Sequence, residues 1–174
     1  LYDQLTCDMK EQLDLLEGLL KSDRVTGRQR IAKICVLSAY MKRRSNLCLL
    51  AESEKQTSTK ELELCISESL ESMRLCNLFC SFESHCSGKT AAGELILLYD
   101  VVQQIFQQLL ADAGAVMIWL RAENDSLFLK LQSDGRLCTE FPAMERWSAA
   151  GGSFSVSCGP DAAWLILQKE GGKG

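Results

Sequence analysis

The chain has 174 residues, of which 47% are hydrophobic and 24% are charged, enough for one moderate core and a smaller appendage. Its net charge of −4 and pI near 5.1 give no basic footprint to replace phosphate counterions, so we expect no nucleic-acid partner.

Two helices are predicted at the N-terminus. Polar and glycine residues from 22 to 27 separate them, and a capping box of Thr26 and Gln29 begins the second. Each helix has an apolar stripe that one partner helix cannot bury. We therefore expect residues 1–56 to form an antiparallel hairpin that dimerises as a four-helix bundle. The expected inner residues are Leu5, Met9, Leu13, Leu16 and Leu20 in the first helix and Ile31, Ile34, Leu37, Met41 and Cys48 in the second.

The next two helices are also amphipathic. A capping box of Ser58 and Glu61 opens a helix that runs to about residue 76, and a strand at 78–83 follows. A long helix then begins near residue 95, and Gly114 suits its C-cap because glycine reaches the left-handed conformation easily. The residues expected to face the core are Leu62, Ile66, Leu70 and Met73 in the first of these helices and Leu95, Leu98, Val102, Ile105 and Leu109 in the second, with Gln103 and Gln107 outside the stripe.

The C-terminal part predicts two β-hairpins around a short helix. Strands at 116–121 and 127–131 flank a turn at 123–126, and strands at 154–158 and 163–167 flank a turn at 159–161. A helix at 143–149 lies between them. The fold class is therefore α+β: a helical hairpin followed by an α/β sandwich, whose mixed sheet has helices on one face.

Several short strings give this order of elements a family likeness. They are Tyr99-Asp100-Val101-Val102-Gln103-Gln104, Asp112-Ala113-Gly114-Ala115, Ala149-Ala150-Gly151-Gly152-Ser153-Phe154, and Trp164-Leu165-Ile166-Leu167 before Gly171-Gly172. Together they resemble the cytoplasmic core of sensor histidine kinases over nearly the whole chain. The resemblance implies a dimerisation hairpin at residues 1–56 and an ATPase-like domain of the Bergerat fold at 57–174.

The resemblance also places the nucleotide site, and there this sequence departs from the family. The family's catalytic Glu, its Mg²⁺-binding Asn and the His or Lys that often follows correspond to Gln104, Gln108 and Asp112. The adenine-reading Asp corresponds to Ser133, with Asp134 one residue displaced and Gly135 retained. Residues 136–142 are too short and too poor in glycine for the phosphate-cradling lid. The resemblance therefore implies that Gln108, Ser133, Asp134 and Gly135 are remnants of an ATP site.

A phosphoacceptor histidine is also missing. In the family it lies on the first hairpin helix before an acidic residue, where this chain has Tyr2 followed by Asp3. The only histidine, His85, falls at the end of a predicted strand.

These departures favour a degenerate, pseudokinase-like signalling module that acts as a homodimer and binds a protein partner, with no cofactor. One alternative is an active ATP- and Mg²⁺-dependent kinase that uses Gln108, Asp112 and Asp134. Another is a phosphotransfer adaptor that docks a response-regulator-like protein. We expect a cytoplasmic location, because no apolar run of about 18 residues and no signal peptide is present. The chain starts without Met, so a missing upstream region could still anchor it to a membrane.

Four smaller motifs receive structural interpretations. The nine cysteines are interpreted as reduced thiols that fill space, since no Cys-x-x-Cys pair supports a metal site. Gly88-Lys89-Thr90 resembles the end of a P-loop but lacks its upstream glycine. The basic run Lys42-Arg43-Arg44 is interpreted as a solvated helix face, with an acidic partner, phosphate or an anionic membrane surface as alternatives. Trp119 and Phe128 lie opposite the leucine rows, either under a helix or at a partner site.

Overall fold

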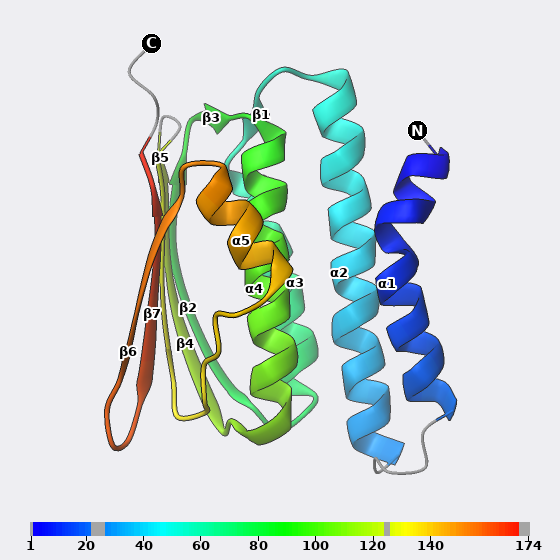
Figure 1. Ribbon diagram of the computed structural model, residues 1–174, viewed down its shortest axis with the longest axis vertical. Coiled ribbons are helices and arrows are strands. Elements are labelled where there is room, and N and C mark those ends of the chain that lie inside the picture. The colour runs from blue at the N-terminus through cyan, green and yellow to red at the C-terminus, as the bar shows by residue number, and fades with distance from the viewer. Residues whose placement is uncertain (1, 22–26, 124–125, 171–174) are drawn as a thin grey trace.

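The computed structural model describes residues 2–21, 27–123 and 126–170. Its elements form layers: α1 lies outermost, then α2, then α3, α4 and α5, and finally a five-stranded sheet (Figure 1). The helices are α1 (Tyr2–Lys21), α2 (Gly27–Ser53), α3 (Lys60–Arg74), α4 (Ala92–Asp112) and α5 (Pro142–Ala149). The strands are β1 (Thr57–Ser58), β2 (Phe79–Ser87), β3 (Lys89–Thr90), β4 (Ala115–Glu123), β5 (Ser126–Ser133), β6 (Ser153–Cys158) and β7 (Ala163–Lys169).

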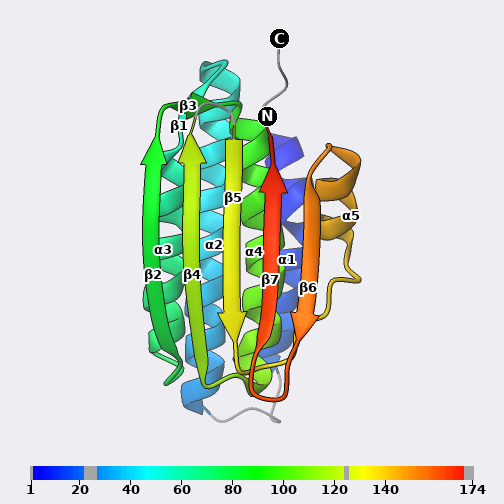
Figure 2. The same ribbon diagram turned by 90° about the vertical axis from the view of Figure 1, so that its left-hand side faces the viewer.

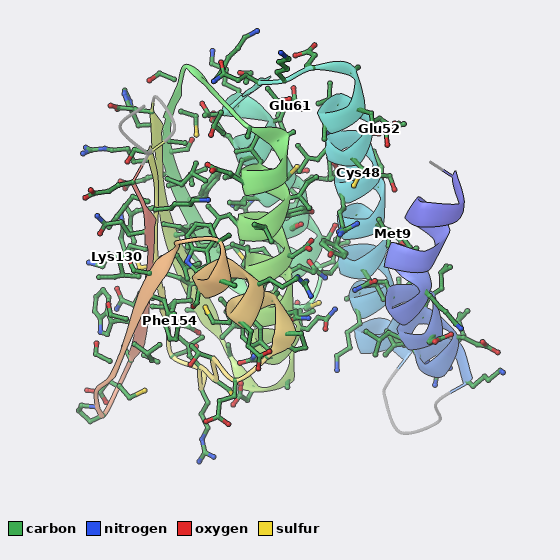
Figure 3. The ribbon with its side chains drawn as sticks, turned by 45° about the horizontal axis from the view of Figure 1, so that its top comes forward. Met9, Cys48, Glu52, Glu61, Lys130 and Phe154 are labelled. Atoms are coloured by element: carbon green, nitrogen blue, oxygen red, sulfur yellow. The ribbon has the colours of Figure 1, made fainter. Side chains whose placement is uncertain are left out.

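The sheet has the order β2-β4-β5-β7-β6 (Figure 2). Strands β2 and β4 are parallel, and every other neighbouring pair is antiparallel. Because side chains alternate along a strand, the leucines of β5 at 127, 129 and 131 face the helices and are fully buried. Trp119, Phe128 and Lys130 occupy the opposite face, which none of the described helices covers, and Figure 3 shows Lys130 projecting from it. The sequence left two positions open for Trp119 and Phe128, and they are not under a helix.

The inward stripes of α3 and α4 are confirmed. Leu62, Ile66, Leu70 and Met73 of α3 are buried, and the five predicted leucine, valine and isoleucine positions of α4 are completely buried. The capping box of Ser58 and Glu61 is wrong, because the helix begins at Lys60 and the Ser58 hydroxyl accepts a hydrogen bond from the Lys60 amide instead. Gln103 was expected outside the stripe but is 1% exposed.

Gly114 does not provide a left-handed C-cap. Helix α4 ends in the extended residue Ala113 (φ −83°), and Gly114 has no positive φ. Its small size serves a close approach instead, since a Cβ there would lie 3.0 Å from the Asp134 carboxylate oxygen Oδ2.

The N-terminal hairpin forms as predicted, but its buried faces differ from the predicted stripes. Helix α2 packs against α1 on one side and against α3 and α4 on the other, so its buried positions spread around the helix. Ile31 was expected to face inward and is 63% exposed, and Leu13 and Leu20 of α1 are also exposed. The side chains of Leu5 and of the capping box Thr26 and Gln29 lie outside the described residues.

Within the described ranges, no helix is both long and apolar enough to cross a membrane. The cysteines whose side chains are described form no disulfide with one another, and none of them belongs to a metal-ligating group among the described residues. The strand β3 contains Lys89 and Thr90 and pairs with β1, so the segment that resembles a P-loop is part of a two-stranded sheet. The basic run is a solvated face only at Lys42, whose side chain is 60% exposed. Lys42 and Arg43 pair with Glu68 of α3, and the largely buried Arg44 pairs with Asp100 of α4.

Candidate functional site

Four of the predicted site residues lie where α4 ends and where the segment 134–141 follows β5. They are Gln108, Ser133, Asp134 and Gly135. Gln108 projects from the last turns of α4 toward this segment. Its amide donates through Nε2 to the Cys138 carbonyl (3.2 Å), and its Oε1 accepts from the Cys138 N–H (2.9 Å). This pair of bonds ties the segment directly to α4. Both hydrogen-bonding ends of the Gln108 side chain are therefore occupied by the protein's own backbone.

The Asp134 carboxylate is also hydrogen-bonded to the backbone. The Asp134 oxygen Oδ1 accepts hydrogen bonds from the N–H groups of Gly114 and Ala115, both at 2.9 Å. Two backbone amides at the start of β4 thereby fix the carboxylate. Asp134 thus joins the end of β5 to the α4–β4 connection.

Ser133 and Gly135 complete this arrangement. The Ser133 hydroxyl donates to the Ala115 carbonyl (2.9 Å) and accepts from the Gly135 N–H (3.0 Å). A Cβ on Gly135 would come within 2.8 Å of the Ala113 side chain and 3.1 Å of an Asp112 oxygen. The retained glycine therefore allows β5 to pack closely on the end of α4.

Gln104 and Asp112 do not join the hydrogen-bonded group. Gln104 lies one turn before Gln108, and its Oε1 is buried without a hydrogen-bond partner in the described part of the chain. Asp112 is exposed at the end of α4. A hollow of about 490 Å³ adjoins the corner, but its lining comes from residues 134–137 and 158–163, so neither Gln104 nor Gln108 borders it.

Helix α5 covers the side of α4 next to this corner. Ala143, Met144 and Trp147 are buried, and the Trp147 indole donates to the Ser153 carbonyl (3.1 Å). The ring leaves no room at Gly152, where a Cβ would lie 2.3 Å from it. ATP with Mg²⁺ needs free donors and a metal-binding amide or carboxylate. Of the side chains that the resemblance assigns to this group, Gln108 and the Oδ1 atom of Asp134 are bonded to backbone groups in this structure.

His85 lies far from the hairpin in the fold, on the outer strand β2. It is exposed, and its Nε2 is 3.0 Å from Glu123 of β4. Tyr2 begins α1, but its side chain lies outside the described residues.

A buried polar cluster at the centre of α4 was not predicted. Asp100 is 4% exposed; it accepts from the Tyr40 hydroxyl at 2.7 Å and from Arg44 at 2.9 Å, both on α2. Arg146 of α5 reaches the other carboxylate oxygen at 3.5 Å. One carboxylate therefore joins the hairpin, the long helix and α5. The sequence holds one signal that could have revealed this cluster, which is the charged residue Asp100 inside an apolar run between Tyr99 and Val101.

Burial and charge act together in this cluster. Burial, followed by the negative charge of Asp100, raises the pKa of the Tyr40 hydroxyl far above its ordinary value, so the phenol stays protonated and donates. Burial lowers the pKa of Arg44, but Asp100 more than offsets this and the net pKa is raised.

Comparisons with family models and with curated proteins find no match. Solved structures do match. A structure described as a bacterial phosphotransferase has a TM-score of 0.55 and 11% identity, covering 96% of this chain and 93% of its own. The histidine kinase domain of a blue-light-activated kinase from Erythrobacter litoralis has a TM-score of 0.57 and 12% identity, covering 93% and 94%. The Acinetobacter baumannii histidine kinase AdeS has a TM-score of 0.50 and 13% identity, covering 92% and 95%. The chain therefore has the fold of a sensor histidine kinase core, hairpin and sandwich together.

Proposed function

We propose that this protein is a signalling module that keeps the histidine kinase fold but works by self-association and protein binding instead of nucleotide chemistry. The observation that carries the proposal is the pair of hydrogen bonds between Gln108 and Cys138. A nucleotide with its metal would need that amide and the space over α4. Here the Gln108 amide is bonded to Cys138, in the segment 134–141 that would have to move to admit the nucleotide.

The neighbouring residues support the same proposal. Asp134 is bonded to two backbone amides, and Gln104 carries no charge and cannot act as a base. Helix α5 adds buried side chains over α4, and its Arg146 is tied to Asp100. Gln108 and Asp134 are thus hydrogen-bonded to backbone groups, and Gln104 offers no charge for a metal ion.

The hairpin supports the self-association part. Leu13 and Leu20, seven positions apart on one face of α1, are 45% and 62% exposed, and Ile31 of α2 is 63% exposed. An apolar surface of this kind on a helix pair is typical of a bundle interface. Tyr40 and Arg44 connect α2 to α4, so a change in hairpin packing has a direct contact path into the sandwich.

Thermal unfolding with ATP or ADP, with and without Mg²⁺, tests the absence of nucleotide binding. A ligand at a hundredfold excess over its Kd stabilises a protein by about 2.7 kcal/mol, so micromolar binding is visible at millimolar nucleotide. We expect no shift, even in Gln108→Asn, which restores the family's amide. A Mg²⁺-dependent shift that Asp134→Ala removes and the control Asp14→Ala, on α1, retains would overturn the proposal and favour the active-kinase alternative.

The second candidate is a phosphotransfer adaptor that docks a response-regulator-like protein. It is favoured by the match to the structure described as a bacterial phosphotransferase, which extends over hairpin and sandwich alike. It requires an acceptor side chain, and the only histidine lies on β2. Incubation with phosphorylated response regulators and mass spectrometry of the chain distinguishes the two: a phosphorylated residue on α1 or α2 would favour the adaptor.

A further inference from the structure

The edge strand β6 is a second surface open to association. It pairs with β7 on one side and is the last strand of the sheet on the other. All six of its residues, 153–158, are exposed, including Phe154 at 42% and Val156 at 37%. Proteins usually protect such an edge with charged residues, proline or a bulge. The sequence of β6, Ser-Phe-Ser-Val-Ser-Cys, contains neither a charge nor a proline.

The hairpin turn shows which backbone groups of β6 face outward. The Gly159 N–H donates to the Ala162 carbonyl at 2.8 Å, and hydrogen-bonded pairs alternate with unbonded pairs along an antiparallel ladder. Continuing from that bond through the register of β6 and β7, the backbone groups of Ser153, Ser155 and Ser157 face β7. Those of Phe154, Val156 and Cys158 point to the open edge.

We propose that β6 pairs with the β6 strand of a second copy of this chain, so that two five-stranded sheets become one. Antiparallel pairing about a two-fold axis at Val156 places Val156 opposite itself and Phe154 opposite Cys158 of the other copy. All outward N–H and C=O groups of the three residues then find partners. The side chains on both faces of this pair are serine, apolar residues or cysteine, so no charge is brought against its own kind.

The other edge of the sheet lacks this self-complementarity. Strand β2 carries Glu83 and His85, both exposed. Pairing β2 with itself about its centre would place Glu83 opposite its own copy, and like charges in that position are destabilising. A second copy is therefore the occupant that β6 fits, and β2 does not compete for it. This pairing is independent of the hairpin surface, because β6 and α1 lie on opposite sides of the molecule (Figure 1).

Sedimentation of Leu20→Glu, which removes the hairpin surface, isolates the pairing of β6. We expect this variant to associate to a dimer with rising concentration. Adding Val156→Pro removes one outward N–H from each copy while sparing the bonds to β7. Two lost hydrogen bonds weaken the association about 30-fold. The control Val156→Thr keeps the N–H and a β-branched side chain, and it should associate as before.

A second variant guards against misfolding of the proline substitution. Val156→Lys keeps every backbone group but places two ammonium groups on the two-fold axis, and it should also stop association. The proposal is overturned if the Leu20→Glu chain is monomeric at every concentration, or if both Val156→Pro and Val156→Lys leave its association unchanged. The two proposals can fail separately. If the chain pairs through β6 but not through the hairpin, the wild-type chain is a dimer, Leu20→Glu leaves that dimer intact, and Val156→Pro dissociates it.

Discussion

At the scale of single residues, Gln108 shows how a chemical position becomes a structural one. Its two bonds to Cys138 predict that Gln108→Ala lowers the free energy of unfolding by about 1–2 kcal/mol, since each net hydrogen bond contributes about 1 kcal/mol. Urea denaturation followed by circular dichroism measures this. Gln107→Ala, one position away on the same helix, is the control and should change little. Equal losses in both variants would mean that lost packing of the glutamine side chains, not the bonds to Cys138, is responsible.

Asp100 should be the most sensitive charged residue of the chain. Asp100→Asn takes the carboxylate from Tyr40 and from Arg44, whose side chain is only 12% exposed, and breaking a buried pair in this way costs about 3–5 kcal/mol. The exposed Asp112→Asn on the same helix should be nearly neutral. Urea denaturation of both variants gives the comparison, and a loss below about 1 kcal/mol for Asp100→Asn would show that the cluster does not hold the hairpin on α4.

The ion pairs of Glu68 account for part of the expected loss of folding stability at acid pH. Its bonds to Lys42, and then to Arg43, lower its pKa below the ordinary value of 4.5. A lowered pKa in the folded state means that the stabilisation is complete above the ordinary value and is lost as the pH falls through the folded value. Unfolding curves of the wild type and Glu68→Gln should therefore differ at neutral pH and converge below pH 4.5. A constant difference across that range would contradict the assignment.

At the scale of elements, the contact of α5 with the start of β6 depends on one glycine. Gly152→Ala places a Cβ 2.3 Å from the Trp147 ring, and overpacking of this kind costs about 1–3 kcal/mol. Gly93→Ala in α4 meets no atom within 4 Å and should be neutral or stabilising by up to about 1 kcal/mol. Urea unfolding followed by Trp fluorescence measures both. An unshifted midpoint for Gly152→Ala would mean that α5 moves away freely.

Most elements could be predicted from the sequence because their patterns are local. The stripes of α3 and α4, the two β-hairpins and the short helix after Pro142 follow from periodicity and turn residues within each segment. The faces of α2 could not be assigned so simply. That helix packs between α1 and the α3–α4 pair, and a stripe on one side of a helix cannot reveal two sets of neighbours.

At the scale of the whole molecule, the candidate site was only partly predictable. The resemblance singled out Gln108, Ser133, Asp134 and Gly135, and in the structure Asp134 and Ser133 are bonded at the start of β4 and Gln108 is bonded to Cys138. Their hydrogen bonds run to backbone groups of Ala115 and Cys138, which no side-chain pattern encodes. The Asp100 cluster joins residues more than 40 positions apart in the sequence, so it required the assembled fold.

The hairpin surface gives the last prediction, the oligomeric state. Light scattering on the Val156→Pro background, where pairing through β6 is removed, should find a dimer at tens of micromolar. Leu13→Glu with Leu20→Glu should convert it to a folded monomer, because both leucines are exposed on α1 and a buried carboxylate at a bundle interface is strongly unfavourable. Leu64→Glu, on an equally exposed leucine of α3, is the control and should remain dimeric. A monomeric Val156→Pro protein would contradict dimerisation through the hairpin. A dimer that only Leu64→Glu dissociates would place the interface on α3. A dimer that depends on the α1 leucines would make the Tyr40–Asp100–Arg44 contacts the shortest route from the interface to the sandwich, since α2 is the only hairpin helix that carries them.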